Sequence, residues 1–308
     1  MRTLLAVSLL LASTLSASAQ TLLLQHPTVN RGHVVFAYAD DLWSVTRTGG
    51  AATRLTSGAG LETGPMFSPD GKHIAFTADY DGNLDVYVMN AEGGQPRRLT
   101  WHPGPDRAVG WTPDSKRVLF TSIRDNETRS FGGRLFTVPI EGGHPDALPL
   151  PHADHGCYAP DGKQVAYVPH KLPSRMAWKR YRGGTTSFIW LARLDDSSVK
   201  PIPRKDSNDH SPVWIGDQVY FLSDRDGPTT LYVYDIKSAN VHKLIDNNGE
   251  DLKSLQRGPD CLVYEQFGSI HLFNLETKSH QKLDIRVLAD FPALNPRTVK
   301  ATKTITNA

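Results

Sequence analysis

Acidic residues and histidines recur at corresponding places along this 308-residue sequence. The set comprises His26, Glu62, Asp106, Asp154 with His155, Asp209 with His210, and Glu250. If the fold brings these positions together, the summed negative potential of the five carboxylates would attract cationic groups such as peptide N-termini. Carboxylates at chain turns also commonly accept backbone N–H bonds, which would make the same residues structural. The sequence leaves both interpretations open, with a metal-binding ring as a third and weaker one.

No other motif assembles a catalytic centre within this chain. The sequence lacks a Gly-x-Ser-x-Gly elbow, a His-Glu-x-x-His helix, a phosphate loop and a Cys-x-x-Cys pair. Asp209, His210 and Ser211 are consecutive, and consecutive residues on a strand point to opposite faces, so they cannot form a triad. The acidic stretch 79–85 lacks the closing Glu of a calcium loop and is typical of a hairpin. We therefore expect no catalytic residue, no metal and no cofactor.

A second cluster mixes aromatic and basic side chains: Trp178, Arg180, Tyr181 and Arg182. Trp, Tyr and Arg are enriched at protein interfaces, so these residues are predicted to dock onto another domain or subunit. The alternative is an ordinary solvated face.

The elements that position these residues are set by an internal repeat. The sequence FSPDGKHIAF from Phe67 returns as WTPDSKRVLF from Trp111 and as YAPDGKQVAY from Tyr158. Degenerate copies occupy residues 31–36, 214–221 and 258–264. The closing aromatics, Phe36, Phe76, Phe120, Tyr167, Phe221 and Tyr264, are spaced by 40, 44, 47, 54 and 43 residues. This period indicates propeller blades.

Each repeat contains enough strand-like segments for a four-stranded blade. A β-branched and aromatic stretch such as residues 85–89 follows the closing aromatic, and a polar outer strand such as residues 97–100 comes next. In residues 68–71 (Ser-Pro-Asp-Gly), proline presets φ and glycine accepts a positive φ, so the chain reverses there. No segment has a sustained helical period. The fold predicted is an all-β six-bladed propeller of four-stranded antiparallel blades, over residues 20–285.

The N-terminal segment predicts that the protein is exported from the cytoplasm. Arg2, the apolar run 4–15 and the small residues 17–19 predict a signal peptide over residues 1–19, hence a periplasmic or secreted protein without membrane insertion after cleavage. With 34 basic against 32 acidic residues, nucleic acid is not an expected partner. Cys157 and Cys261 are predicted to be free thiols. Residues 286–308 are predicted to be a linker toward a further domain.

The repeat resembles that of TolB-type propellers of secreted bacterial proteins. Residues 178–184, 134–139 and 295–300 more narrowly resemble the N-terminal six-bladed propeller of tricorn-type serine proteases. That resemblance implies a second propeller, a PDZ-like domain and a catalytic core beyond this chain. It also implies that this chain is an inactive propeller that channels or gates peptides for proteolysis or docks onto those domains. Its partners would be peptides or the missing peptidase domains, with a homo-oligomer allowed in a full-length form. The alternatives are a free-standing TolB-like protein-binding propeller and, less favoured, a channel-metal hydrolase.

Overall fold

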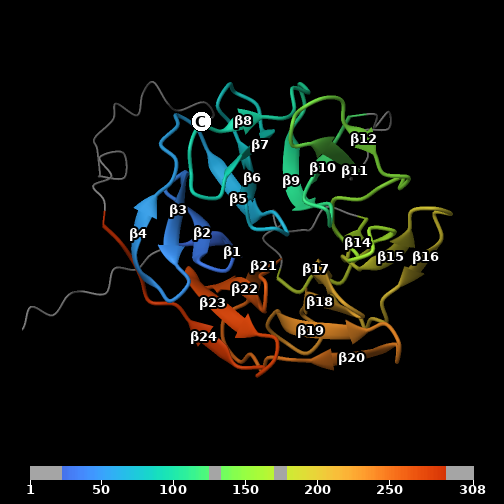
Figure 1. Cartoon of the computed structure of the whole chain (residues 1–308). Helices are drawn as coiled ribbons and strands as arrows, with labels where there is room; N and C mark the ends of the chain where they lie inside the picture. The colour runs from blue at the N-terminus through green and yellow to red at the C-terminus, as the bar shows by residue number, and fades with distance from the viewer. Residues whose placement is uncertain (1–22, 125–132, 170–178, 289–308) are drawn as a thin grey trace, which may run out of the picture.

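The computed structural model describes residues 23–124, 133–169 and 179–288. Within these ranges the strands form six sheets, which Figure 1 shows as blades around a central axis. The predicted all-β six-bladed propeller is confirmed. In the same ranges there is no helix long and apolar enough to cross a membrane. The predicted signal peptide, residues 1–19, lies outside the described residues.

The strands follow one another blade by blade along the chain. The first three blades contain β1 (Gln25–Val29), β2 (His33–Tyr38), β3 (Asp41–Thr46) and β4 (Gly50–Arg54); β5 (Glu62–Phe67), β6 (His73–Ala78), β7 (Asp85–Asn90) and β8 (Arg97–Arg98); and β9 (Asp106–Trp111), β10 (Arg117–Ser122), β11 (Arg134–Pro139) and β12 (Asp146–Ala147). The last three contain β13 (His155–Tyr158), β14 (Gln164–Val168), β15 (Trp190–Arg193) and β16 (Val199–Pro201); β17 (Asp209–Ile215), β18 (Gln218–Ser223), β19 (Thr230–Asp235) and β20 (Asn240–Lys243); and β21 (Leu252–Arg257), β22 (Cys261–Gln266), β23 (Ser269–Asn274) and β24 (His280–Lys282).

Every blade is an antiparallel meander built from one continuous stretch of chain. A further strand, β25 (Ile285–Val287), pairs in parallel with the outer strand β4 and places Ile285 opposite Gly50. The first residues of the predicted linker, 286 and 287, therefore belong to the sheet of blade 1. Residues 289–308 lie outside the part of the chain that the structure describes.

The core consists of apolar clusters between adjacent blades. The closing aromatics of the repeats are at most 3% exposed, which confirms that they belong to the core. Each cluster draws on two neighbouring blades; one, for example, joins Phe76 and Tyr87 of blade 2 to Val35 and Leu42 of blade 1. A single blade cannot bury both of its faces, so each depends on two neighbours.

The predicted turn at residues 68–71 forms as the sequence indicates. Gly71 has φ of 74° and its N–H donates to the Ser68 carbonyl at 2.8 Å. The Asp70 carboxylate accepts from the Ser68 hydroxyl at 2.6 Å and from the Lys72 N–H at 3.1 Å. Asp114 accepts the corresponding pair of bonds in blade 3. The repeat thus encodes the reversal between the innermost strand and the next one.

The ring closes by contacts between whole blades, because no described blade combines strands from both ends of the chain except through β25. The His26 N–H donates to the Glu265 carboxylate at 2.7 Å, and the Leu24 N–H donates to the Gly268 carbonyl at 3.1 Å. An apolar cluster containing Phe36, Trp43, Val263 and Ile270 fills the same junction. Blades 1 and 6 are therefore held together as the other neighbours are.

Four innermost strands share a bulge that sequence reasoning missed. Each has a register shift against its neighbour, with one residue at positive φ. These residues are His26, Gly64, Ser211 and Ser254, with φ of 51°, 60°, 52° and 54°. Proline follows three of them, and because proline donates no N–H it is tolerated where strand pairing is interrupted. An X-Pro pair at the same place in three repeats was the available signal.

Candidate functional site

Three predicted ring carboxylates are buried at blade junctions. Glu62, Asp106 and Asp209 begin β5, β9 and β17, and none is more than 1% exposed. These three carboxylates are therefore enclosed by protein and are not exposed to the channel. The bonds they make decide between the two interpretations of the ring.

Blades 3 and 5 hold the carboxylate in the same way. Arg225, two residues beyond β18, forms an ion pair with Asp209 at 2.8 Å, and Arg124, two residues beyond β10, pairs with Asp106. Each guanidinium lies over two core rings: Phe221 and Tyr232 at 5.2 and 5.0 Å, and Phe120 and Phe136 at 5.2 and 5.4 Å. In both blades the second strand ends at the serine of a Ser-x-Arg sequence, which was the signal for this motif.

Blade 2 has tyrosine in place of this arginine. The Tyr80 hydroxyl donates to Glu62 Oε1 at 2.5 Å, and its ring meets Tyr87 edge-on with centroids 4.8 Å apart. The Leu42 N–H of blade 1 donates to Glu62 Oε2 at 3.3 Å, and the Thr56 hydroxyl bonds the same oxygen. Burial raises the pKa of Glu62, and burial likewise raises that of Asp106. Bonds to side chains and to one neighbouring backbone N–H thus favour a structural role for these carboxylates.

The remaining ring residues occupy other environments. His26 Nδ1 shares a hydrogen bond of 3.2 Å with the Ser254 hydroxyl. Glu250 is exposed and lies 3.9 Å from Lys179. Asp154 precedes β13 and its N–H donates to the Val168 carbonyl at 2.9 Å. The eight predicted residues therefore do not share one setting.

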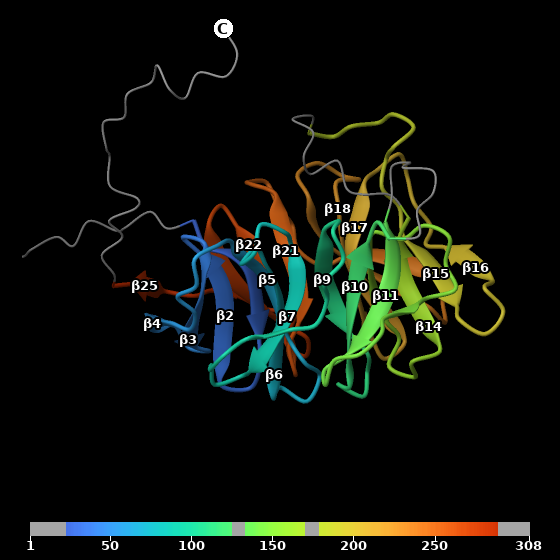
Figure 2. The same cartoon turned by 90° about the horizontal axis from the view of Figure 1, so that it is seen from above.

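The segment that carries the predicted docking cluster folds back onto its own chain. Arg182 forms an ion pair with Asp224 of blade 5 at 2.8 Å, and the Asn208 amide donates to the Tyr181 carbonyl at 3.0 Å. The Tyr181 side chain lies over Gly183, where a Cβ would meet its hydroxyl at 1.9 Å unless the tyrosine moved. Figure 2 shows the segment passing over the ends of β17 and β18. Arg180 is exposed, and Trp178 lies outside the described residues.

His155 and His210 lie on the innermost strands of adjacent blades, and burial lowers the pKa of each to about 4. Acidification should therefore destabilise the propeller. Because the unfolded chain binds more protons between an ordinary pKa of 6.5 and the folded value of about 4, the free energy of unfolding falls as pH drops through this window.

Replacing both histidines with Gln should flatten this part of the dependence, measured by urea unfolding at several pH values between 7 and 4. The nearby carboxylates, Asp224 and Asp251, act in the opposite direction and remain in both proteins. A double variant whose stability falls as steeply as that of the wild type would contradict the assignment.

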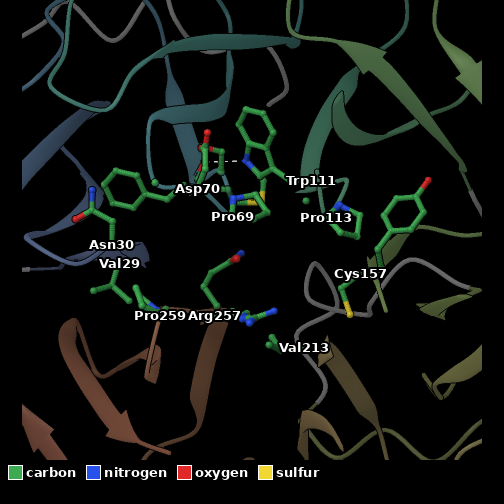
Figure 3. Close-up of a pocket in the computed structure, with 18 of the residues that line it drawn as sticks. Val29, Asn30, Pro69, Asp70, Trp111, Pro113, Cys157, Val213, Arg257 and Pro259 are labelled. Carbon is green, nitrogen blue, oxygen red and sulfur yellow. Dashed lines mark hydrogen bonds between the residues drawn. The ribbon is translucent and has the colours of Figure 1, made fainter. Parts of the chain in front are cut away.

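The central channel holds a cavity of about 1030 Å³. It is lined by the later halves of the innermost strands and the turns that follow, as Figure 3 shows for Trp111, Cys157, Val213 and Arg257. The Trp111 and Trp214 indole N–H groups donate to the Met66 and Gly216 carbonyls, both at 3.0 Å. Both indoles line the cavity but are only 8% and 5% exposed, because most of each ring packs into the core between blades. Apolar walls with a few polar groups are typical of ligand sites.

The channel also presents backbone groups. In each sheet the innermost strand pairs only with the second strand, so its other edge faces the channel. Such an edge carries unpaired N–H and C=O groups that an extended peptide can bind. The cavity thus combines sheet edges with aromatic and proline side chains.

The cysteines and the candidate metal ligands bear on the metal-hydrolase alternative. Cys157 and Cys261 are free, as predicted, and burial raises their pKa values to about 12 and about 11. Among described residues, no three His, Cys, Asp or Glu side chains are grouped to hold a metal ion. The geometry thus lends the metal-hydrolase alternative no support.

Comparison with known proteins identifies the family. The family described as "Tricorn protease N-terminal beta propeller domain" matches residues 21–279. The chain belongs to this family. Tricorn protease homolog 1 of Streptomyces coelicolor is 31% identical over 265 residues, which are 82% of this chain and 24% of the relative. Tricorn protease of Thermoplasma acidophilum is 27% identical over 271 residues, covering 85% and 25%.

Solved structures agree with the tricorn assignment. A crystal structure of the tricorn protease superposes with a TM-score of 0.75 at 26% identity, over 88% of this chain and 27% of that one. A TolB structure from Agrobacterium tumefaciens gives a TM-score of 0.60 at 24% identity, over 73% and 81%, and shows a shared fold. This tricorn-family propeller spans about a quarter of the length of the curated relatives named above.

Proposed function

We propose that this tricorn-family propeller binds extended peptides in its central channel and serves a serine peptidase whose catalytic residues lie outside this chain. The observation that carries the proposal is the cavity itself, where the edges of the innermost strands and proline side chains surround about 1030 Å³. Edge strands supply main-chain hydrogen bonds to peptides of many sequences, and apolar walls favour their side chains. The protein would act in the periplasm or after secretion, following removal of residues 1–19.

Narrowing the channel should weaken peptide binding. Gln256, the second-last residue of β21, lines the cavity and is partly buried. Gln256→Trp is expected to reduce the affinity for an acetylated and amidated Ala-Leu-Gly-Ala-Leu-Gly peptide at least ~10-fold, because the larger side chain occupies the space of the ligand. Isothermal titration measures the change.

A matched control places the same bulk outside the channel. Asn240 is an exposed residue of the outer strand β20, so Asn240→Trp should leave the affinity unchanged. Equal affinities for wild type and Gln256→Trp, with both proteins folded, would refute the channel as the binding site.

The chain alone should show no peptidase activity. No described set of side chains provides a nucleophile, a base and an oxyanion hole together. We expect fluorogenic peptides to be cleaved at the background rate, with heat-unfolded protein as the control. Labelling by a serine-directed fluorophosphonate that requires the folded chain would overturn this expectation.

The free-standing TolB-like alternative differs in its partner, which would be a folded protein instead of a peptide. The TolB structure supports the shared fold but carries no information on what this chain binds. A peptide titration that shows no binding would favour the alternative.

A further inference from the structure

Arg257 is an arginine in the channel wall without a partner. It is the last residue of β21 and lines the cavity, where Figure 3 places it among Val213, Cys157 and Pro259. The residue is exposed, and its side chain makes no hydrogen bond or ion pair with any described residue. Arg124 and Arg225, in contrast, are each paired with a buried carboxylate. A guanidinium carries five donors, so one left unpaired in a cavity is available to an anion.

Arg257 is not paired with the acidic residues that line the cavity. The lining carboxylates are Asp70 and Glu92, and neither is bonded to Arg257. Asp70 is already bonded to the Ser68 hydroxyl and the Lys72 N–H. The wall next to Arg257 is apolar or neutral instead. Its field reaches Cys157, where it acts to lower a thiol pKa that burial raises.

The geometry points to Arg257 as the group of the channel that binds a carboxylate carried by a peptide, an inference that rests on the proposed function. A planar guanidinium binds a carboxylate through two parallel N–H···O bonds. A peptide without a carboxylate cannot form this pair of bonds. The exposed Pro259, which Figure 3 places beside Arg257, would contact the apolar residues next to that carboxylate. The channel should therefore prefer acidic over neutral peptides.

Three hexapeptides of equal length test this. One is the neutral acetylated and amidated peptide described above, the second carries Glu at its third position, and the third is acetylated, has only uncharged side chains and ends in a free carboxylate. By isothermal titration at low salt, wild type should bind at least one charged peptide ~10-fold more tightly than the neutral one. A preference for the second peptide indicates an acidic side chain as the ligand, and a preference for the third indicates the C-terminus.

The variant Arg257→Gln should fold normally, because the side chain is exposed and unpaired, and should lose the ~10-fold preference while still binding the neutral peptide. Arg31→Gln is the matched control, since Arg31 also lines the cavity, is exposed and makes no hydrogen bond or ion pair with a described residue, but lies in the turn after β1 and not on an innermost strand. It should keep the preference. Equal binding of all three peptides to wild type, or a preference that survives Arg257→Gln or disappears in Arg31→Gln, overturns the inference alone. Absence of binding by every peptide overturns it together with the proposed function.

Discussion

Asp209→Ala should lower the free energy of unfolding by about 3–5 kcal/mol, the range found when one partner of a buried ion pair is removed. The Arg225 side chain is only 6% exposed, and the variant leaves it without its carboxylate. The Ser207 and Ser223 hydroxyls, which bond Asp209 at 3.1 and 2.5 Å, lose their acceptor as well. Urea unfolding monitored by near-UV circular dichroism measures the loss.

Two further variants show whether the buried pair is the cause. Asp217 and Lys237 form an exposed pair, with side chains 60% and 78% accessible, so Asp217→Ala should change stability little. Combining Asp209→Ala with Arg225→Met should cost less than Asp209→Ala alone, because no uncompensated charge remains buried. An Asp209→Ala protein as stable as the wild type would show that the carboxylate is not structural.

The same position tests the gating interpretation of the ring. A gating carboxylate predicts that Asp209→Asn weakens the binding of a basic peptide at low salt with little loss of stability. The structural interpretation predicts a lower melting temperature with unchanged peptide affinity.

Deleting blade 6, from Asn248 onward, should abolish the cooperative tertiary structure of the whole domain. The deletion removes half of the cluster that contains Leu222 and Tyr264, and half of the one that contains Phe36 and Val263. Both faces of the gap would then expose apolar surface, and β1 would lose its bond to Glu265. Near-UV circular dichroism and calorimetry of the shortened chain measure the result.

A chain that ends at Leu288 is the control, because it keeps every contact of the described strands, including β25 on β4. It should melt as the full chain does. Five remaining blades that melt with an unchanged midpoint would contradict a closed ring held by contacts between neighbours.

The fold could be predicted from the sequence because its signals are local. Four-stranded blades follow from a repeat of 40 to 54 residues, and the turn after the innermost strand of blades 2, 3 and 4 follows from the Ser-Pro-Asp-Gly type of sequence. These features depend on backbone preferences within a few residues and on the alternation of apolar side chains. The closing aromatics could be assigned to the core for the same reason.

The site could be predicted only in part, because a repeat shows which positions are equivalent and not where their side chains point. Equivalence brought Glu62, Asp106 and Asp209 into one group, and that grouping is correct in that each begins an innermost strand. Only the packed blades decided that Tyr80, Arg124 and Arg225 bind these carboxylates within the junctions.

The sequence by itself determined the architecture: the number of blades, the strands of each blade and the reversals between them. Only the tertiary structure decided which charges are neutralised and which remain available. Arg225 has a partner 16 residues away in its own blade, whereas Arg257 lines a cavity shared with Val29 of the neighbouring blade 1 and Trp111 of blade 3. The physical reason is that strand and turn preferences act over a few residues, while burial and pairing of a charge depend on every blade that surrounds it.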